Sequence, residues 1–169
     1  PFKRIGESFW AFMPINYGIY AVFLLAGGLE IYPWMHQEMP AHKAVWLQPH
    51  FFVARQLGMI GLLMVLDFFF IRNSLRADMG VAAESLGSRT PAWWGRFTSG
   101  WRGRDAEVED TYQKNVRLAP LIVVLYAILW SLFSIDAIMS LAPHWYANMF
   151  PGWQFVSSFW LALNWICIV

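Results

Sequence analysis

The sequence predicts an all-α protein that is integral to a membrane and folds as a four-helix bundle. Of its 169 residues, 58% are hydrophobic and only 14% are charged, whereas soluble domains carry roughly 25% charged residues. The eleven tryptophans favour membrane interfaces, where the amphipathic indole ring lies at headgroup level. Four apolar segments approach or reach the roughly 20 residues that a helix needs to cross a bilayer.

The four expected spans cover residues 9–34, 50–71, 118–141 and 150–169. Lipid offers backbone groups no hydrogen-bond partners, so each span should be an α-helix. The ten-residue alternation of polar and apolar residues that marks membrane β-barrels does not repeat here. Two glycine pairs, Gly27-Gly28 and Gly58 with Gly61, either let helices approach closely or are ordinary transmembrane glycines.

Both ends of the chain suggest that it is a fragment of a longer polytopic protein. Pro1 stands first without a methionine, and Val169 ends the chain inside an apolar segment with no flanking charge. The opening residues lead into a run that is too long for a signal peptide and lacks a small-residue cleavage site. Cys167 is the single cysteine, which excludes an internal disulfide and a Cys-rich metal site.

The distribution of basic residues predicts the orientation of the spans. Lys3 and Arg4 precede the first span, and the opposite side carries only Lys43, apart from Arg55 just within the second span. Basic loops stay in the cytoplasm, so the N-terminus and the loop 73–117 should lie on the cytoplasmic side of a bacterial inner membrane. The basic residues between the second and third spans are Arg72, Arg76, Arg89, Arg96, Arg102, Arg104, Lys114 and Arg117.

The loop 73–117 is the only sizeable hydrophilic part of the sequence. Its acidic residues nearly balance its basic ones, which argues against a nucleic-acid partner. Its stretch PAWWGRFTSGW sets aromatic residues among arginine and glycine, as in segments that lie on a lipid surface. Contact with a neighbouring subunit is the alternative. The stretch DAEVEDTYQKNV predicts a helix that leads into the third span, with Asp110 and Lys114 one turn apart.

All four histidines fall on the predicted periplasmic side: His36, His42, His50 and His144. No two of them have the i, i+4 spacing of a helical metal site, and the cysteines of haem attachment are missing. We therefore assign no metal or haem ligand, and expect these histidines to contact a periplasmic partner.

Four ionisable residues lie at membrane depth: Glu30, Arg55, Asp67 and Asp136. Such groups are costly in hydrocarbon and usually pair with one another or face a wet interior. Glu30, Arg55 and Asp136 should each lie roughly 6–8 Å below the periplasmic ends of their helices, so they can pair. Asp67 should lie about 18 Å further toward the cytoplasm than Arg55.

Two interpretations of these charges remain open. In the first, the carboxylates exchange protons along a path or in a quinone pocket, and Ser131, Ser134 and Tyr126 extend a polar file. In the second, Arg55 forms a buried structural tie with Asp136 or Glu30, and this ion pair fixes helix packing. The proton-path candidates are Asp136, Asp67, Glu30, Arg55, Ser140 and His144, and no residue is assigned as catalytic, cofactor-binding or metal-binding.

Five stretches, in order and at fitting distances, resemble the ActF-type membrane subunits of alternative complex III, a quinol:cytochrome c oxidoreductase, within the polysulfide-reductase-like (NrfD-like) family. They are FKRIGESFWAFMP, IYPWMHQE, WLQPHFFVARQ, RNSLRAD and IDAIMSLAPHWYANMF. The last is similar to a family motif of Asp-Trp, then Met-Ser and His-Trp-Phe-Ser-Thr-Met-Phe. Ala137, Ala147 and Asn148 depart from that motif, as does Pro151 at the start of the last span, so a divergent member is expected.

The resemblance implies a whole protein of two four-helix bundles beside a second, homologous membrane subunit. It implies periplasmic partners that carry iron–sulfur clusters and several c-type haems, while this chain binds no cofactor itself. Quinol oxidation is expected mainly in the homologous membrane subunit, with quinone nearby, and this chain is expected to be a non-redox scaffold with a proton-translocation route. The resemblance implies that four positions of this sequence correspond to functional positions of the family: Arg55, Asp136, Ser140 and His144.

Two rival functions stay open. A purely structural membrane anchor would need the intramembrane charges only to pin helices together. A solitary transporter or channel would be purified without redox partners and usually has a helix broken at mid-membrane.

Overall fold

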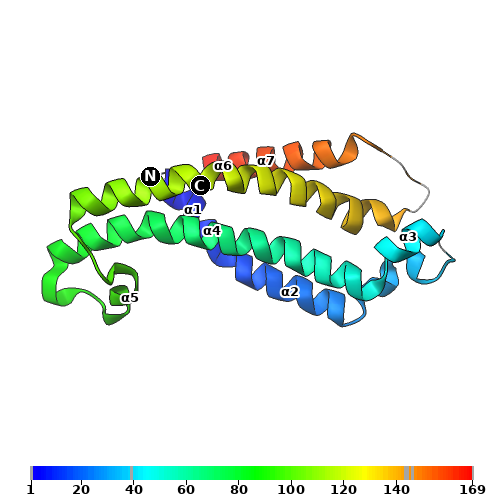
Figure 1. Cartoon of the computed structure of the whole chain (residues 1–169), viewed down its shortest axis with the longest axis horizontal. Coiled ribbons are helices and arrows are strands. Elements are labelled where there is room, and N and C mark those ends of the chain that lie inside the picture. The colour runs from blue at the N-terminus through cyan, green and yellow to red at the C-terminus, as the bar shows by residue number, and fades with distance from the viewer. Residues whose placement is uncertain (1, 39, 143–144, 146, 169) are drawn as a thin grey trace. The chain divides into compact units, whose positions relative to one another are not determined.

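The computed structural model describes residues 2–38, 40–142, 145 and 147–168. Within these ranges every regular element is a helix and no strand occurs, which confirms the all-α prediction. The α-helices are α1 (Phe2–Ser8), α2 (Met13–Leu25), α3 (Ala41–Trp46), α4 (Pro49–Leu86), α5 (Gly95–Thr98), α6 (Arg104–Phe133) and α7 (Phe150–Ile168). Figure 1 shows their course.

Short tight helices join the α-helices. The 3₁₀ segments are η1 (Phe9–Phe12), η2 (Gly28–Ile31), η3 (Pro33–Met35), η4 (Gly87–Arg89), η5 (Ala92–Trp94) and η7 (Met139–Leu141), and η6 (Ser134–Ile138) is a π-helical turn. The chain divides into two compact units. Unit 1 comprises residues 1–64 and 125–169, and unit 2 comprises residues 65–124.

In the part of the chain that the structure describes, three helical segments are long and apolar enough to cross a membrane: Lys3–Leu25, Pro49–Arg89 and Arg104–Leu141. Few of their apolar side chains are buried, and many are exposed, among them Ile19, Val22 and Val123. Exposed apolar surface of this extent is typical of proteins whose surroundings are lipid or other membrane helices. The fourth expected span corresponds to α7, whose membrane crossing stays a prediction.

The first span ends earlier than the sequence suggests. α2 stops at Leu25, and Gly27 takes a φ of 105°, a left-handed conformation that glycine adopts without a steric penalty. Gly28 then packs so tightly that an added Cβ would collide with the carbonyl oxygen and ring of Phe23. The glycine pair therefore ends the helix, and residues up to Trp34 form η2 and η3 instead.

The hydrophilic region 73–117 is largely helical. α4 continues past the expected span to Leu86, and α6 already begins at Arg104, so only residues 87–103 connect the two helices. The sequence SLRADMGVAAESL consists mostly of good helix formers, which explains the continuation. The expected helix at DAEVEDTYQKNV is present, and Lys114 Nζ lies 2.8 Å from Asp110 Oδ2.

Within unit 1, α2 lies along the first half of α4, and α7 lies along the second half of α6 (Figure 1). The hydroxyl of Tyr17 donates to the carbonyl of Leu57 at 3.2 Å, and the hydroxyls of Tyr126 and Ser158 lie 2.9 Å apart. These contacts tie each pair of neighbouring helices together through polar groups.

The buried core of unit 1 is aromatic. The rings of Tyr32, Trp34 and Phe52 lie with centroids 5.2–5.4 Å apart, and Leu24 completes the cluster. Tilted aromatic pairs at this spacing contribute about 0.5–1.5 kcal/mol each beyond the burial of their surface. The cluster therefore fixes η3 against the start of α4.

Candidate functional site

Asp136 lies at the centre of the most polar buried cluster among the described residues of unit 1. α6 ends at Phe133, and the chain then widens into the π-helical turn Ser134–Ile138 before tightening into η7. Asp136 sits in that turn with 1% of its surface exposed. Single π-turns inside longer helices occur frequently at functional sites, because they displace a side chain from the regular helical register.

Three donors from α3 and α4 surround the carboxylate of Asp136. Oδ2 accepts hydrogen bonds from Arg55 Nε at 2.6 Å and from Gln56 Nε2 at 3.1 Å. Oδ1 accepts from the indole Nε1 of Trp46 at 2.8 Å. The sequence prediction that Arg55 and Asp136 can pair is thus met by their geometry, and both carboxylate oxygens are occupied.

Arg55 is held on several sides at once. Its Nη1 donates to the carbonyl of Trp46 at 3.1 Å, and its Cζ lies 4.0 Å from the centroid of the Trp46 ring. The rings of Phe51 and Phe52 approach the same guanidinium at 4.7 and 5.8 Å. Cation–π contacts strengthen when the cation is desolvated. Nη2 is buried and has no hydrogen-bond partner among the described groups.

Further hydrogen bonds orient the groups that touch Asp136. The hydroxyl of Tyr20 donates to Gln56 Oε1 at 3.3 Å, which leaves the amide nitrogen of Gln56 free for Asp136. The hydroxyl of Ser140 donates to the carbonyl oxygen of Asp136, and Trp34 Nε1 lies 3.4 Å from that hydroxyl. The π-turn is therefore anchored from η3 as well as from α4.

Tyr32 adds a further bond to the π-turn. Its hydroxyl donates to the carbonyl of Ala137 at 3.0 Å, and only 3% of the residue is exposed. Burial, followed by the negative charge of Asp136, raises the pKa of Tyr32 above its ordinary value. The phenol consequently stays protonated and remains a donor at neutral and mildly alkaline pH.

The other proton-path candidates lie elsewhere. Glu30 is exposed in η2, beyond the end of α2, and its backbone carbonyl contacts His36 Nε2 at 3.0 Å. Its expected place in the first membrane helix is therefore wrong, because Gly27 ends that helix. Asp67 is half-buried on α4 in unit 2, without a hydrogen bond or ion pair to any described side chain. His144 lies outside the described residues.

The polar file suggested for the third span is discontinuous in the described structure. The hydroxyl of Ser131 donates back to the carbonyl of Ala127 at 2.7 Å, the common alternative for a serine within a helix. Ser134 is fully buried and its hydroxyl has no partner among the groups that the structure describes. Tyr126 contacts Ser158 on α7.

Sequence reasoning missed Trp46, Gln56, Tyr32 and Trp34 as parts of this site. Gln56 follows Arg55 directly, so an amide beside a buried arginine is a usable signal. Tyr32 and Trp34 stand out in the sequence only as members of a family-like stretch. Trp46 likewise stands out only as the first residue of a family-like stretch, and its contact with Asp136 depends on how residues 33–48 fold back over α4.

Chemically, the cluster is a buried carboxylate fixed by one cation and two neutral donors. Each of its oxygens accepts at least one N–H, so losing any of the three donors would remove a hydrogen bond from a buried carboxylate. Among the residues that the structure describes, no group of three or more His, Cys, Asp or Glu side chains is placed to hold a metal ion.

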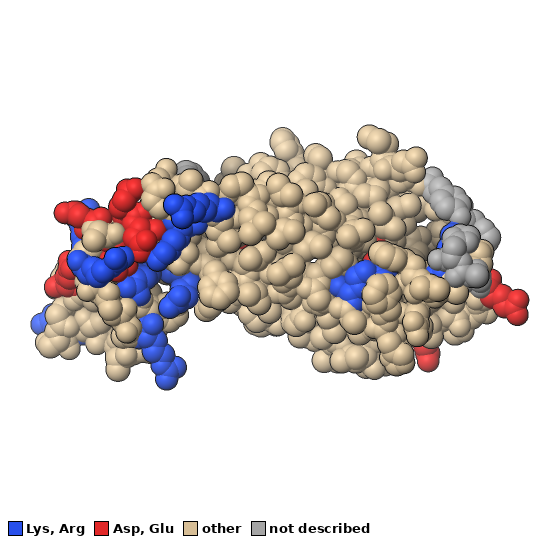
Figure 2. All heavy atoms as spheres, viewed as in Figure 1, with Lys and Arg blue, Asp and Glu red and all other residues tan. Residues whose placement is uncertain are grey.

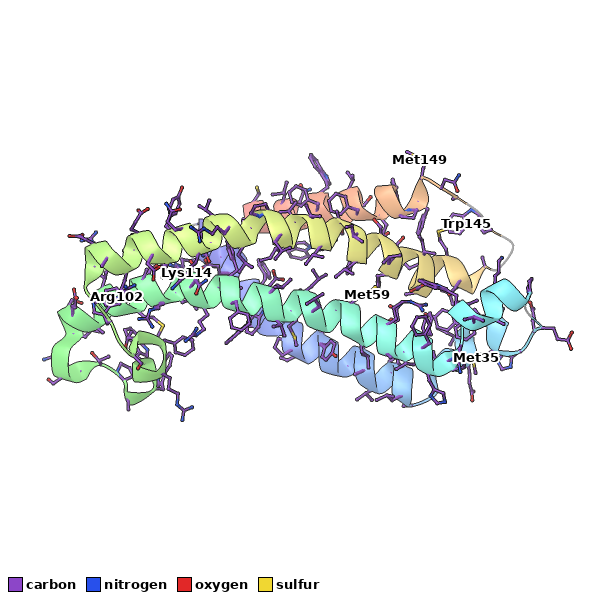
Figure 3. All side chains as sticks on the ribbon, in the orientation of Figure 1. Met35, Met59, Arg102, Lys114, Trp145 and Met149 are labelled. Carbon is purple, nitrogen blue, oxygen red and sulfur yellow. The ribbon has the colours of Figure 1, made fainter. Side chains whose placement is uncertain are left out.

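A cavity of about 330 Å³ opens beside the cluster, at the end of unit 1 that carries α3. Trp34, whose indole contacts Ser140, lines it together with the amides Gln37 and Gln48. Met35, labelled in Figure 3, contributes an apolar wall. The lining thus combines a planar ring with neutral hydrogen-bonding groups.

No protein-family model matches the sequence, and no curated protein or solved structure matches it either.

Proposed function

We propose that this chain is an integral membrane subunit of a quinol-oxidising electron-transfer complex similar to alternative complex III. The observation that carries the proposal is the convergence of three family-like stretches on one cluster. IYPWMHQE supplies Tyr32 and Trp34, WLQPHFFVARQ begins at Trp46 and supplies Arg55, and IDAIMS supplies the π-turn. Stretches that resemble a family in sequence and also bond to one another support a common origin better than either feature alone.

The proposed location is a bacterial inner membrane, with the N-terminus of the chain in the cytoplasm. Three membrane-length helices and their exposed apolar side chains support a membrane setting, and the basic residues of the 73–117 region support the orientation. In the proposed assembly, α7 is the fourth helix of a bundle, and a second bundle belongs to the rest of the protein.

The proposed partners follow from the resemblance. They are a second, homologous membrane subunit and periplasmic subunits with iron–sulfur clusters and c-type haems, which carry the redox centres. Exposed tryptophans on α7, Trp153 and Trp160, offer a surface suited to lipid or to a second membrane protein. The cavity lined by Trp34, Gln37 and Gln48 is the place where this chain would contact a quinone headgroup.

For Asp136, the geometry favours a structural tie over a freely exchanging proton carrier. Three donors hold both of its oxygens in place, and Arg55 is its counter-ion. In this role the pair joins the π-turn to α4 and, through Trp46, to the segment outside the membrane. The scaffold part of the proposed function rests on this tie.

For a proton-translocation route, Asp67 is the stronger candidate. It is half-buried, and within the described part of the chain nothing pairs with it. A carboxylate without a fixed cation can take up and release a proton with less rearrangement than one held by arginine. We therefore assign the exchanging role to Asp67 and the tie to Asp136.

The test uses the complete purified complex and measures protons moved per electron during quinol oxidation. Asp67→Asn should lower this ratio while the complex still assembles, whereas Asp136→Asn should reduce assembly. Glu30→Gln, an exposed carboxylate, is the matched control and should change neither. An unchanged ratio in Asp67→Asn removes the proton route, and a chain that purifies without redox partners removes the assignment to such a complex.

A further inference from the structure

The segment between α4 and α6 folds back along α4 instead of extending into solvent. At about 1.5 Å per residue, Leu86 lies about 22 Å beyond Ile71, where the expected span ends. Headgroup layers are only roughly 5–8 Å thick on each side of the hydrocarbon, so the end of α4 lies beyond them. The segment that follows returns toward Ile71, as α5 beside α4 in Figure 1 illustrates.

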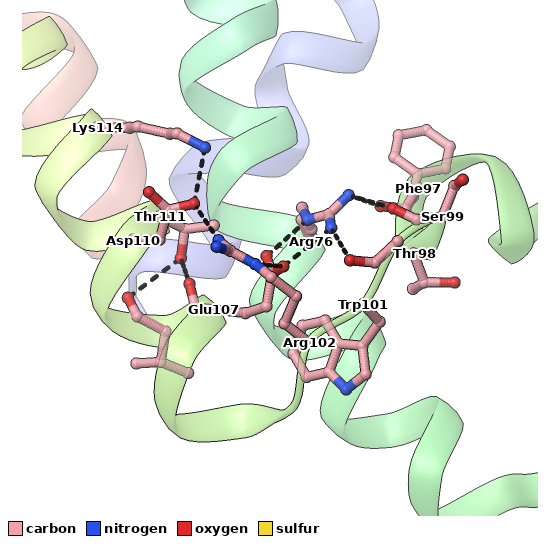
Figure 4. A network of polar contacts seen from close by, with 12 residues as sticks. Arg76, Phe97, Thr98, Ser99, Trp101, Arg102, Glu107, Asp110, Thr111 and Lys114 are labelled. Carbon is pink, nitrogen blue, oxygen red and sulfur yellow. Dashed lines mark hydrogen bonds and ion pairs between the residues drawn. The ribbon is translucent and has the colours of Figure 1, made fainter.

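Arg76 holds the returning segment in place. Its Nη1 donates to the carbonyls of Phe97 at 3.1 Å and Ser99 at 3.0 Å, and its Nε donates to Glu107 at 2.8 Å (Figure 4). Arg76 lies about 8 Å beyond Ile71, and helical side chains tilt toward the N-terminal end of their helix. Its guanidinium therefore holds Phe97 close to the depth of the lipid headgroups.

Trp101 closes the other end of the returning segment. Its ring lies so near Gly80 that a Cβ there would collide with it, and its Nε1 donates to Glu84 at 2.6 Å. Gly80 is thus a position where close approach of the ring requires glycine. Two independent anchors on α4 consequently fix the segment.

The returning segment, residues 91–101, exposes aromatic and basic side chains on its outer side. Trp93 is 60% exposed, and its ring contacts those of Trp94 and Phe97 at 5.9 and 6.2 Å between centroids. Arg96 within the segment and Arg89 just before it are exposed, and neither pairs with a described residue. The segment itself contains no acidic residue.

The acidic residues at this end of unit 2 are partly neutralised internally. Glu107 binds both Arg76 and Arg102, and Asp110 binds Arg102 and Lys114. Charged side chains gather visibly around the α5 region in Figure 2. Because Arg96 stands outside this network, its charge is available to an external anion.

From this arrangement we propose that residues 91–97 form a binding site for anionic phospholipid headgroups. Trp93 inserts at the interface, where indole rings are favoured, and Arg96 binds headgroup phosphates. Continuity with α4 and α6 places the site at the membrane surface, so the inference rests on the proposed membrane location. Each basic side chain near an anionic leaflet raises the affinity of its segment for the membrane roughly fivefold.

The test measures hydrogen exchange of the whole chain in two kinds of nanodisc, phosphatidylcholine alone and phosphatidylcholine mixed with phosphatidylglycerol. Amides 92–99 should exchange more slowly in the anionic discs, and added salt should abolish the difference. Arg96→Gln should reduce the difference, by up to about fivefold. Arg104→Gln, an exposed arginine at the start of α6 outside the segment, is the control and should leave it intact.

A second measurement checks the insertion of Trp93. The emission of Trp93 is the part of the wild-type fluorescence that the Trp93→Phe substitution removes. Lipids brominated near the headgroup should quench this part. The proposal is overturned if amides 92–99 exchange equally fast in both kinds of disc, or if brominated lipids do not quench the Trp93 emission. It is also overturned if Arg104→Gln reduces the exchange difference as much as Arg96→Gln does. Protection by a neighbouring protein would appear only in the assembled complex and would also overturn it. A chain that fails to span the disc overturns the proposed membrane function instead.

Discussion

The indole Nε1 of Trp46 donates a 2.8 Å hydrogen bond to Oδ1 of Asp136, although ninety positions separate the two residues in sequence. Trp46 ends α3, outside the membrane-length helices, whereas Asp136 belongs to one of them. The backbone carbonyl of Trp46 also accepts from Arg55, so one residue contacts both members of the ion pair. The segment outside the spans is therefore part of the buried site.

Trp46→Phe should destabilise the protein by about 1–3 kcal/mol, because a buried carboxylate oxygen loses its donor. The smaller ring can still stack on Arg55, so the loss isolates the hydrogen bond. Unfolding in detergent micelles or nanodiscs, followed by temperature or denaturant, provides the measurement. Trp160→Phe changes an exposed indole on α7 and should have little effect; equal losses in the two variants would contradict the assignment.

Removing one member of the Arg55–Asp136 pair should cost about 3–5 kcal/mol, because an uncompensated charge remains buried. The double variant Arg55→Met with Asp136→Leu removes both charges, but it leaves the N–H donors of Trp46 and Gln56 without their acceptor. The double variant should thus regain part of the loss, and adding Gln56→Leu should regain more. Unfolding free energies of the singles, the double and the triple measure this, and a double as unstable as the singles would argue against a structural tie.

Tyr32 should make stability depend on alkaline pH. Its pKa is raised in the folded protein by burial and by Asp136, so its contribution is fully present below the unfolded value of about 10 and is lost as pH rises above it. The free energy of unfolding of the wild type should fall relative to Tyr32→Phe above that pH, and the gap should be constant between about pH 6 and 9. Tyr112→Phe, an exposed tyrosine in unit 2, is the matched control.

The sequence predicts the helical class and the ion pair because both depend on strong, local energetic rules. Apolar runs of bilayer length must be helical, and Arg55 and Asp136 at equal depth can neutralise each other. The same rules could not predict the end of the first helix, since Gly27 can either sit in a helix or adopt a positive φ. Only the tertiary surroundings of Gly27 select the positive φ.

The remaining site residues could not be predicted because they depend on tertiary folding. Trp46 reaches Asp136 through a segment whose path no periodicity describes, and the π-turn has no sequence signature of its own. The long continuation of α4 to Leu86 is hidden by its polarity, which suggests a loop, whereas helix propensity is independent of polarity. Arg76 then turns that continuation into a support for the returning segment.

Glu107→Gln should release the segment between α5 and α6. Glu107 is 2% exposed and accepts from Arg76 at 2.8 and 3.2 Å and from Arg102 at 3.1 Å. The neutral amide leaves the charge of Arg76 without its partner, which should cost about 3 kcal/mol locally. Amides 97–100 should then exchange faster and trypsin should cleave after Arg96 or Arg102 more rapidly, whereas Asp105→Asn, an exposed carboxylate in the same turn, should change neither. If the two variants are cleaved at the same rate, the ion pair does not hold the segment, and Trp101 against Gly80 is the sufficient anchor.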